Sequence, residues 1–331
     1  MRPISYSRVS DVGTAIGTVA ADPESAFLAG GTTQVDLLRI YVEQPRRLVD
    51  INDLPLNQIE ELPDGGLRLG GLARMSDVAE QPAVARRYPV VTEALVLGAS
   101  PQLRHMGTLG GNLLQRVRCS YFRDTEAPCN KRAPGTGCSA LDGVNRGHAV
   151  LGTSDCCIAT HPSDLAVALV ALDAVVRTEG PGGSRGIPID DFYLLPGQTP
   201  EREHPLSHGE LITGIDLPAL PVAATSRYIK IRDRESYEFA LASVAVAMSV
   251  AGGRIAEIRL ALGGVATKPW RARAAEQVLD GAPATVESFT RAAEAELAGA
   301  VPHGMNAFKI ELARRTMVRA LTAMAQREET A

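Results

Sequence analysis

The five cysteines of this 331-residue chain are its most chemically suggestive side chains. All of them lie in one window that begins at Gly107 and ends at Asp164. An odd number of thiols crowded into one region does not resemble a disulfide framework, and a metal or iron–sulfur centre explains it better. The candidate ligands are Cys119, Cys129, Cys138, Cys156 and Cys157.

The spacing of these cysteines separates the possible centres. The pattern Cys119-x9-Cys129-x8-Cys138 contains none of the paired C-x2–4-C knuckles on which zinc fingers and ribbons depend. An iron–sulfur cluster accepts spread-out thiolates, commonly four, so either Cys156 or Cys157 is surplus. Structural zinc and a set of buried free thiols stay open as alternatives. A long loop without an organising centre is uncommon, and this argues against the free thiols.

Cationic side chains crowd the same window and could offset the negative charge of a thiolate-ligated cluster. We expect the backbone N–H groups of Gly135 and Gly137 to add to this effect. The cations are Arg116, Arg118, Arg123, Lys131, Arg132 and Arg146.

Two glycine-rich turns and one polar turn indicate a cofactor pocket. Gly30 and Gly31 follow a short apolar strand, where successive N–H groups can form a concavity for a pyrophosphate. A second glycine-rich turn, 107–112, precedes the cysteines, and the turn 162–164 follows them. The turns before and after the cysteines would form two halves of one pocket.

The elements that must position these residues divide into three groups. Apolar patterns predict strands at 25–28 and 47–51 and a helix between them with Val35, Leu37, Leu38 and Val42 near one face. The central part is predicted to hold a hairpin around Pro63–Gly66, a helix N-capped by Ser76, helices at 90–98 and from 165, and a strand at 210–217. The last part is predicted to contain strands at 227–231, 242–250 and 255–262, with helices at 270–279 and 308–324.

Composition is that of a globular protein, with 45% hydrophobic residues, 22% charged residues and a net charge of −4. Scattered basic residues predict no nucleic-acid surface. No apolar run approaches the roughly 18–20 residues of a membrane span, and the N-terminus shows no secretory pattern.

Three motifs carry a resemblance that covers essentially the whole chain. The segments 27–34 (FLAGGTTQ), 104–112 (RHMGTLGGN) and 162–164 (PSD) resemble the FAD loops and the following polar element of the FAD-binding subunits of molybdenum hydroxylases of the xanthine oxidase family. The insertion at about 113–160 is similar to that of a subset with an extra [4Fe–4S] cluster. Within it, the flavin subunits of bacterial periplasmic aldehyde oxidoreductases are more similar than those of 4-hydroxybenzoyl-CoA reductases.

The resemblance implies an α+β architecture. The expected parts are a PCMH-type (vanillyl-alcohol oxidase-like) FAD-binding fold of two α/β lobes, 1–58 and 59–220, and a C-terminal CO dehydrogenase flavoprotein-like domain, 221–331. It also implies four cluster ligands, Cys119, Cys129, Cys138 and Cys157.

FAD-contacting residues follow from the same resemblance. The pyrophosphate is expected at the first loop, which comprises Leu28, Ala29, Gly30, Gly31, Thr32, Thr33 and Gln34. Thr108, Gly111 and Asn112 are expected at the phosphates and nearby flavin atoms, and Asp164 is expected to accept hydrogen bonds from cofactor hydroxyls. Lys230 is expected near the isoalloxazine, where a cation would stabilise an anionic reduced flavin; an ordinary solvated strand lysine is the alternative.

The implied function is electron transfer in a molybdenum-dependent aldehyde oxidoreductase. Electrons would come from a molybdenum subunit through a [2Fe–2S] ferredoxin-like subunit, reach FAD in this chain and leave to an external acceptor, within a heterotrimer. Alternatives are a 4-hydroxybenzoyl-CoA reductase-type subunit, a self-sufficient flavin oxidoreductase and a zinc-binding scaffold. The expected location is the periplasm, by co-export with a partner that has a twin-arginine signal, or otherwise the cytoplasm.

Overall fold

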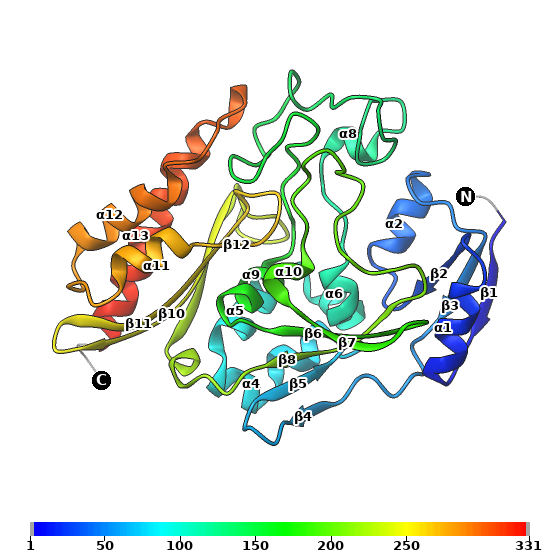
Figure 1. The fold of residues 1–331 in the computed structure, drawn as a ribbon, viewed down its shortest axis with the longest axis horizontal. Coiled ribbons are helices and arrows are strands. Elements are labelled where there is room, and N and C mark those ends of the chain that lie inside the picture. Colours follow the sequence, from blue (N-terminus) through cyan, green and yellow to red (C-terminus); the bar gives the residue numbers. More distant parts are fainter. Residues whose placement is uncertain (1–2, 329–331) are drawn as a thin grey trace.

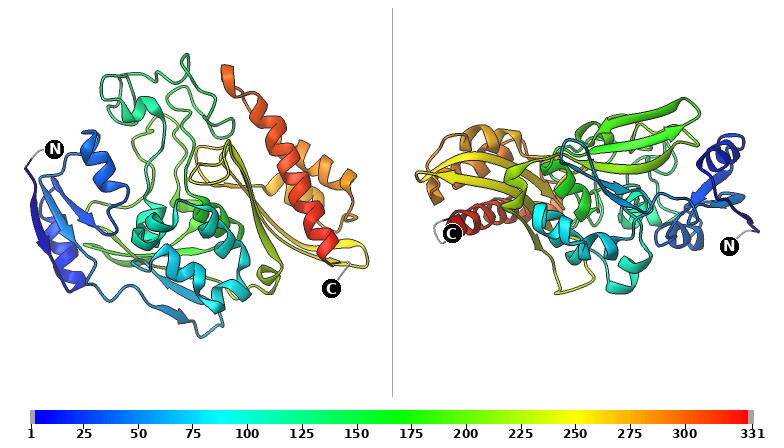
Figure 2. Two further views of the ribbon diagram at one scale, coloured as in Figure 1. Left: turned by 180° about the vertical axis from the view of Figure 1, so that it is seen from behind. Right: turned by 90° about the horizontal axis from the view of Figure 1, so that it is seen from below.

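Three separate sheets organise the chain in the computed structural model, which describes residues 3–328 (Figure 1). Seen from below, they follow one another from the N-terminal lobe to the C-terminal domain (Figure 2). This mixture of helices and sheets is the predicted α+β class. The domain boundaries after residues 58 and 220 stay predictions.

The N-terminal lobe is a parallel three-stranded sheet in the order β1-β3-β2. Leu37 and Leu38 are buried as predicted, but α2 ends before Val42, and the side chain of Val35 is exposed because it lies outside the packed face. The elements are β1 (Ser5–Arg8), α1 (Val12–Ala20), β2 (Ser25–Leu28), α2 (Gln34–Arg39) and β3 (Arg47–Asp50).

The central lobe contains an antiparallel sheet in the order β4-β5-β8-β6-β7, with helices packed on it. Its strands are β4 (Ile59–Glu61), β5 (Leu67–Gly70), β6 (Val175–Gly180), β7 (Gly183–Pro188) and β8 (Leu211–Leu217). Its helices are α3 (Met75–Glu80), α4 (Pro82–Arg87), α5 (Pro89–Leu97), α6 (Pro101–Met106), α7 (Leu109–Leu113), α8 (Ser120–Arg123), α9 (Asp164–Ala171) and α10 (Ile189–Phe192).

Ser76 is not the N-cap that the sequence predicts. The cap of α3 is the extended residue Arg74, and Ser76 lies inside the helix. The helix begins earlier because Arg74 forms a β-bridge with Thr108 and the amide of Met75 donates to the carbonyl of Gly107. A tertiary contact with the second glycine-rich turn therefore sets this helix start.

The C-terminal domain packs helices on an antiparallel sheet in the order β12-β11-β10-β9. Its elements are η1 (Pro221–Ala224), β9 (Ser226–Ile231), β10 (Ala242–Ala251), β11 (Arg254–Gly263), β12 (Trp270–Arg271), α11 (Arg273–Leu279), α12 (Val286–Leu297), η2 (Gly304–Asn306) and α13 (Phe308–Glu328). The helix predicted from Trp270 begins at Arg273 instead, since Trp270 and Arg271 pair with β11.

The cysteine segment, residues 113–160, contains little regular structure beyond α8. It lies between α2 and the start of α13, a placement that is visible from both sides (Figures 1 and 2). A short antiparallel bridge joins Cys129 to Cys138, and another joins Ser154 to Cys157. No helix within residues 3–328 has both the length and the apolar character needed to cross a membrane.

Candidate functional site

Two adjoining cavities form a long pocket between the lobes. Their volumes are about 530 and 570 Å³, and they share the lining residues Thr32, Thr33, Thr108 and Gly111. Both predicted glycine turns therefore lie where the cavities meet. Each cavity has the volume typical of a small-molecule or cofactor site.

The first glycine turn passes directly against the second loop. A Cβ on Gly30 would overlap the backbone of Met106, so only glycine allows this approach. Gly31 has a φ of +70°, a conformation that disfavours other residues. The predicted residues from Ala29 to Gln34 line the second cavity, whereas Leu28, the last residue of β2, lines neither cavity.

The second loop is held by side-chain hydrogen bonds. Thr108 caps α7, and its hydroxyl oxygen accepts from the amide of Gly111 at 3.1 Å. The Ser163 hydroxyl donates to Asn112 Oδ1 at 2.6 Å and also caps α9, where it accepts from Ala166 N at 3.0 Å. The turns before and after the cysteine segment are thus joined, as the prediction of two pocket halves requires.

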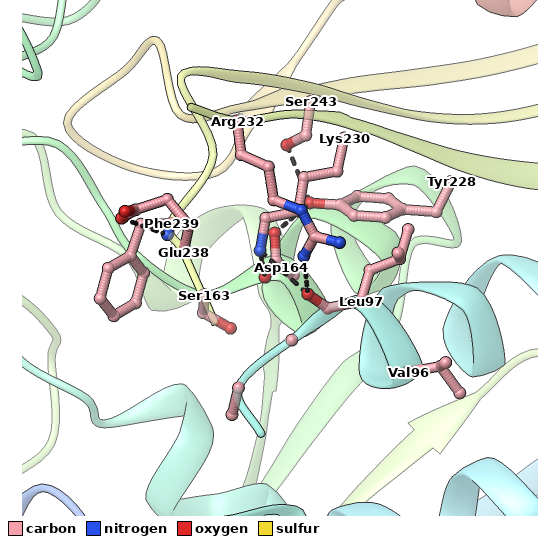
Figure 3. A network of polar contacts seen from close by, with 12 residues as sticks. Val96, Leu97, Ser163, Asp164, Tyr228, Lys230, Arg232, Glu238, Phe239 and Ser243 are labelled. Atoms are coloured by element: carbon pink, nitrogen blue, oxygen red, sulfur yellow. Dashed lines mark hydrogen bonds and ion pairs between the residues drawn. The ribbon is translucent and has the colours of Figure 1, made fainter. Parts of the chain in front are cut away.

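Asp164 and Lys230 both line the first cavity and contact each other (Figure 3). Lys230 Nζ donates to Asp164 Oδ2 at 2.7 Å and to the carbonyl of Leu97 at 3.1 Å. Tyr228 donates its hydroxyl proton to Asp164 Oδ1 at 2.6 Å. The solvated-lysine alternative is wrong, because only 1% of the Lys230 side chain is exposed.

Burial dominates the electrostatics of this network. It raises the pKa of Asp164, although the Lys230 ammonium and the two hydrogen bonds oppose that rise. Burial beside this carboxylate also raises the pKa of Tyr228 well above its ordinary value, so Tyr228 stays a hydrogen-bond donor. Both oxygens of Asp164 have partners within the chain, and its contact with cofactor hydroxyls stays a prediction.

A separate small cavity is lined by all five cysteines. The Cys156 thiol points to Gln198, with Sγ 3.4 Å from Oε1. Cys157 is buried, and its Sγ accepts from the amide of Ala159 at 3.5 Å. Cys157 is therefore better placed than Cys156 to complete a set with Cys119, Cys129 and Cys138.

The thiols of this cavity lie close enough to influence one another's ionisation. Burial raises the pKa of Cys119 to about 11, and the neighbouring Cys129 and Cys157 raise it further. Burial also raises the pKa of Cys157, to which Cys129 and Cys138 contribute. Such thiols are poor nucleophiles as free groups, and a bound metal centre would displace their protons.

The five cysteines are spread around this cavity rather than gathered at one point. Among residues 3–328, no group of three or more His, Cys, Asp and Glu side chains converges closely enough to hold one metal ion. Four thiolates around a [4Fe–4S] cluster do not converge on one point, because each binds a different iron.

The predicted charge compensation is only partly realised. Arg123 pairs with Asp36 of α2 at 2.7 Å, and Arg146 pairs with Asp233 at 2.6 Å. Lys131 is the cation whose charge lowers the pKa of Cys157. The amide of Gly137 donates to Asn130 Oδ1 rather than to a sulfur. Most of the arginines thus fasten the segment to its surroundings.

Comparison with known families agrees with this fold and pocket. Residues 2–220 match the family "FAD binding domain in molybdopterin dehydrogenase", and residues 227–324 match the "CO dehydrogenase flavoprotein C-terminal domain". The chain belongs to this family of FAD-binding subunits within the xanthine oxidase family of molybdenum hydroxylases, and it is an oxidoreductase subunit. Both the predicted family and the predicted fold are confirmed.

Individual relatives cover nearly the whole chain. The aldehyde oxidoreductase FAD-binding subunit PaoB of Escherichia coli K12 is 47% identical over 97% of this chain and 98% of its own. The carbon monoxide dehydrogenase medium chain of Hydrogenophaga pseudoflava is 28% identical over 96% of each chain. A solved carbon monoxide dehydrogenase from that organism superposes with a TM-score of 0.76, at 28% identity, and the match covers 98% of each chain.

Sequence reasoning missed several residues that complete the two sites. Tyr228 joins the Asp164 network, and Asp36 anchors the cysteine segment. His148 lies next to Cys119, with Nε2 3.2 Å from Sγ. No local pattern identifies these residues, because each acts on a partner that is distant in the sequence.

Proposed function

We propose that the chain is the FAD-carrying electron-transfer subunit of a molybdenum-dependent aldehyde oxidoreductase. The observation that carries the proposal is the long pocket, which has glycine turns at its middle and the buried Lys230 at one end. The 47% identity to an aldehyde oxidoreductase FAD-binding subunit over nearly the full length of both chains supports the aldehyde class of substrate.

The residues of the pocket have separable tasks in this proposal. Gly30 and Gly31 bring backbone amides up to the pyrophosphate, and Thr108 holds the facing loop. Lys230 brings a positive charge to the flavin end, where it favours negative charge on its neighbour. Bound FAD supplies exchange of both single and paired electrons. The chain itself contributes binding, orientation and this electrostatic bias.

We also propose that Cys119, Cys129, Cys138 and Cys157 hold a [4Fe–4S] cluster. Their shared cavity, their mutual electrostatic influence and the amide directed at Cys157 support this assignment. The nearby Lys131 ammonium would offset part of the added negative charge. The cluster would serve either as an electron relay or as a charge that tunes the flavin.

The proposed assembly is a heterotrimer. A molybdenum subunit would oxidise the aldehyde, a [2Fe–2S] ferredoxin-like subunit would pass electrons to this chain, and an external acceptor would receive them. Relatives named as subunits or medium chains of such enzymes support this arrangement. We place the complex in the periplasm, exported folded with a partner that has a twin-arginine signal.

Cofactor analysis of the anaerobically purified protein tests the proposal. Flavin, iron and acid-labile sulfide should be measured on one sample, along with the subunits that accompany the chain. We expect one flavin with about four irons. Flavin without iron would refute the cluster alone, and a folded protein with neither would refute the electron-transfer role. Aldehyde oxidation by the isolated chain would support the self-sufficient enzyme instead.

A further inference from the structure

His148 is the buried histidine of the cysteine segment, and it lies against one predicted cluster ligand. Its Nε2 is 3.2 Å from Cys119 Sγ, and only 8% of the residue is exposed. The other ring nitrogen, Nδ1, is buried and has no hydrogen-bond partner among residues 3–328. The single polar contact of the imidazole is therefore the one with sulfur.

The C-terminal domain fixes the position of this histidine. Asn306 Nδ2 donates to the carbonyls of His148 and Ala149 at 3.3 and 3.0 Å. Lys309 Nζ donates to the carbonyls of Gly147 and His148, both at 3.0 Å. Asn306 and Lys309 are themselves fully buried. Two side chains from outside the segment thus direct their hydrogen bonds to the backbone around His148.

Cys119 and His148 also line a cavity that adjoins the one lined by Lys230. This third cavity has a volume of about 340 Å³, and Asp164 lines it too. This cavity shares five lining residues with the cavity that Lys230 lines: Arg118, Pro162, Asp164, Glu238 and Phe239. Among the four predicted ligands, Cys119 is the one that lines it. The contact between His148 and Cys119 therefore lies at a cavity that adjoins the proposed flavin cavity.

The partners of the ring decide which nitrogen holds the proton. A thiolate ligand can only accept, so Nε2 must donate to Cys119 when the cluster is bound. Nδ1 is then a bare lone pair, which is less costly to leave unpaired in the interior than an N–H group. The tautomer with its proton on Nε2 satisfies both conditions.

We propose that His148 is a positioning residue that donates an N–H···S hydrogen bond to the Cys119 thiolate and thereby raises the reduction potential of the cluster. This inference rests on the proposed [4Fe–4S] assignment. One-electron reduction adds a negative charge that is shared by the sulfurs, and a donor aimed at a sulfur stabilises the reduced form more than the oxidised form. Removing the donor should make the cluster harder to reduce.

The test is a redox titration of the full-length protein, with subunits that co-purify, using dithionite as the one-electron reductant and following the cluster by EPR. His148→Phe keeps a ring but removes the donor, and His148→Gln places an amide N–H near the position of Nε2. His204→Phe is the matched control, since His204 is another histidine whose Nδ1 is buried without a partner, and it stacks on Phe192 at 6.1 Å.

We expect full iron content in all the variants, a more negative cluster potential in His148→Phe, and substantial recovery in His148→Gln. The flavin potential and the His204→Phe cluster potential should stay at the wild-type values. An unchanged potential in an iron-replete His148→Phe protein would overturn the inference, as would equal shifts in the Phe and Gln variants. Iron lost from folded His148→Phe would make His148 a ligand rather than a positioning residue. Iron missing from the wild type would refute the cluster and, with it, this inference.

Discussion

Lys230 and Asp164 form a buried ion pair, with Nζ 2.7 Å from Oδ2, although 66 residues separate them in the chain. The pair joins β9 of the C-terminal domain to the first turn of α9 in the central lobe. It therefore links the two family domains at the wall of the proposed flavin cavity.

Replacing one member of this pair should destabilise the protein more than replacing both. Lys230→Met leaves Asp164 buried without its cation, a change that typically costs about 3–5 kcal/mol. The double variant Lys230→Met/Asp164→Asn removes both charges and should recover a large part of that loss. Urea unfolding of the flavin-free protein measures both. A double variant that is no more stable than Lys230→Met would contradict the coupling of the two side chains.

Gly30→Ala should weaken flavin binding and stability, because the added Cβ overlaps the Met106 backbone. The cost of such overpacking is about 1–3 kcal/mol. Gly17→Ala in α1 is the control, since a Cβ there meets nothing within 4 Å. That change should stabilise the helix by roughly 0.5–1 kcal/mol. The flavin-to-protein ratio and thermal unfolding report the outcome, and full flavin content in Gly30→Ala would contradict the close approach of the two loops.

The adjacent cysteines should differ in their effect on iron content. Cys157→Ser removes a buried thiol of the shared cavity and should abolish stable cluster binding. Cys156→Ser changes a thiol that points to Gln198 and should keep the wild-type iron content. Iron and sulfide analysis distinguishes the two. The reverse pattern would move the fourth ligand to Cys156.

Lys309 should give the protein a characteristic dependence of stability on pH. Burial, aided by the charge of Arg146, lowers its pKa from 10.5 to about 7. Between pH 7 and 10.5 the unfolded chain therefore binds more protons at this residue than the folded chain, so stability contributed by this group rises with pH across that window.

Comparison of wild type with Lys309→Met isolates this effect. The difference between their unfolding free energies should change by up to about 1.4 kcal/mol per pH unit between pH 7 and 9, in the direction that favours the wild type at higher pH. Urea titrations at several pH values measure it. A difference that is constant with pH would mean that Lys309 keeps its ordinary pKa in the folded protein.

The sequence predicted those parts of the molecule that local rules control. The turn at Gly30 and Gly31 was predictable because glycines directly after an apolar strand indicate a sharp turn. Gly30 also approaches other backbone so closely that a Cβ is excluded. The strands predicted at 242–250 and 255–262 are likewise found, as the antiparallel pair β10 and β11. The start of α3 escaped prediction because a bridge from Arg74 to Thr108, across the fold, replaced the expected Ser76 cap.

By itself, then, the sequence determined the family, the strand–glycine loops and the confinement of every thiol to one segment. Only the tertiary structure decided that Lys230 meets Asp164, that the Cys156 thiol points to Gln198 whereas Cys157 is buried, and that His148 lies against Cys119. The physical reason is that these contacts join residues that are distant in the chain or depend on which way a side chain turns. Packing of the lobes fixes these distant contacts and side-chain directions, and local propensity specifies neither of them.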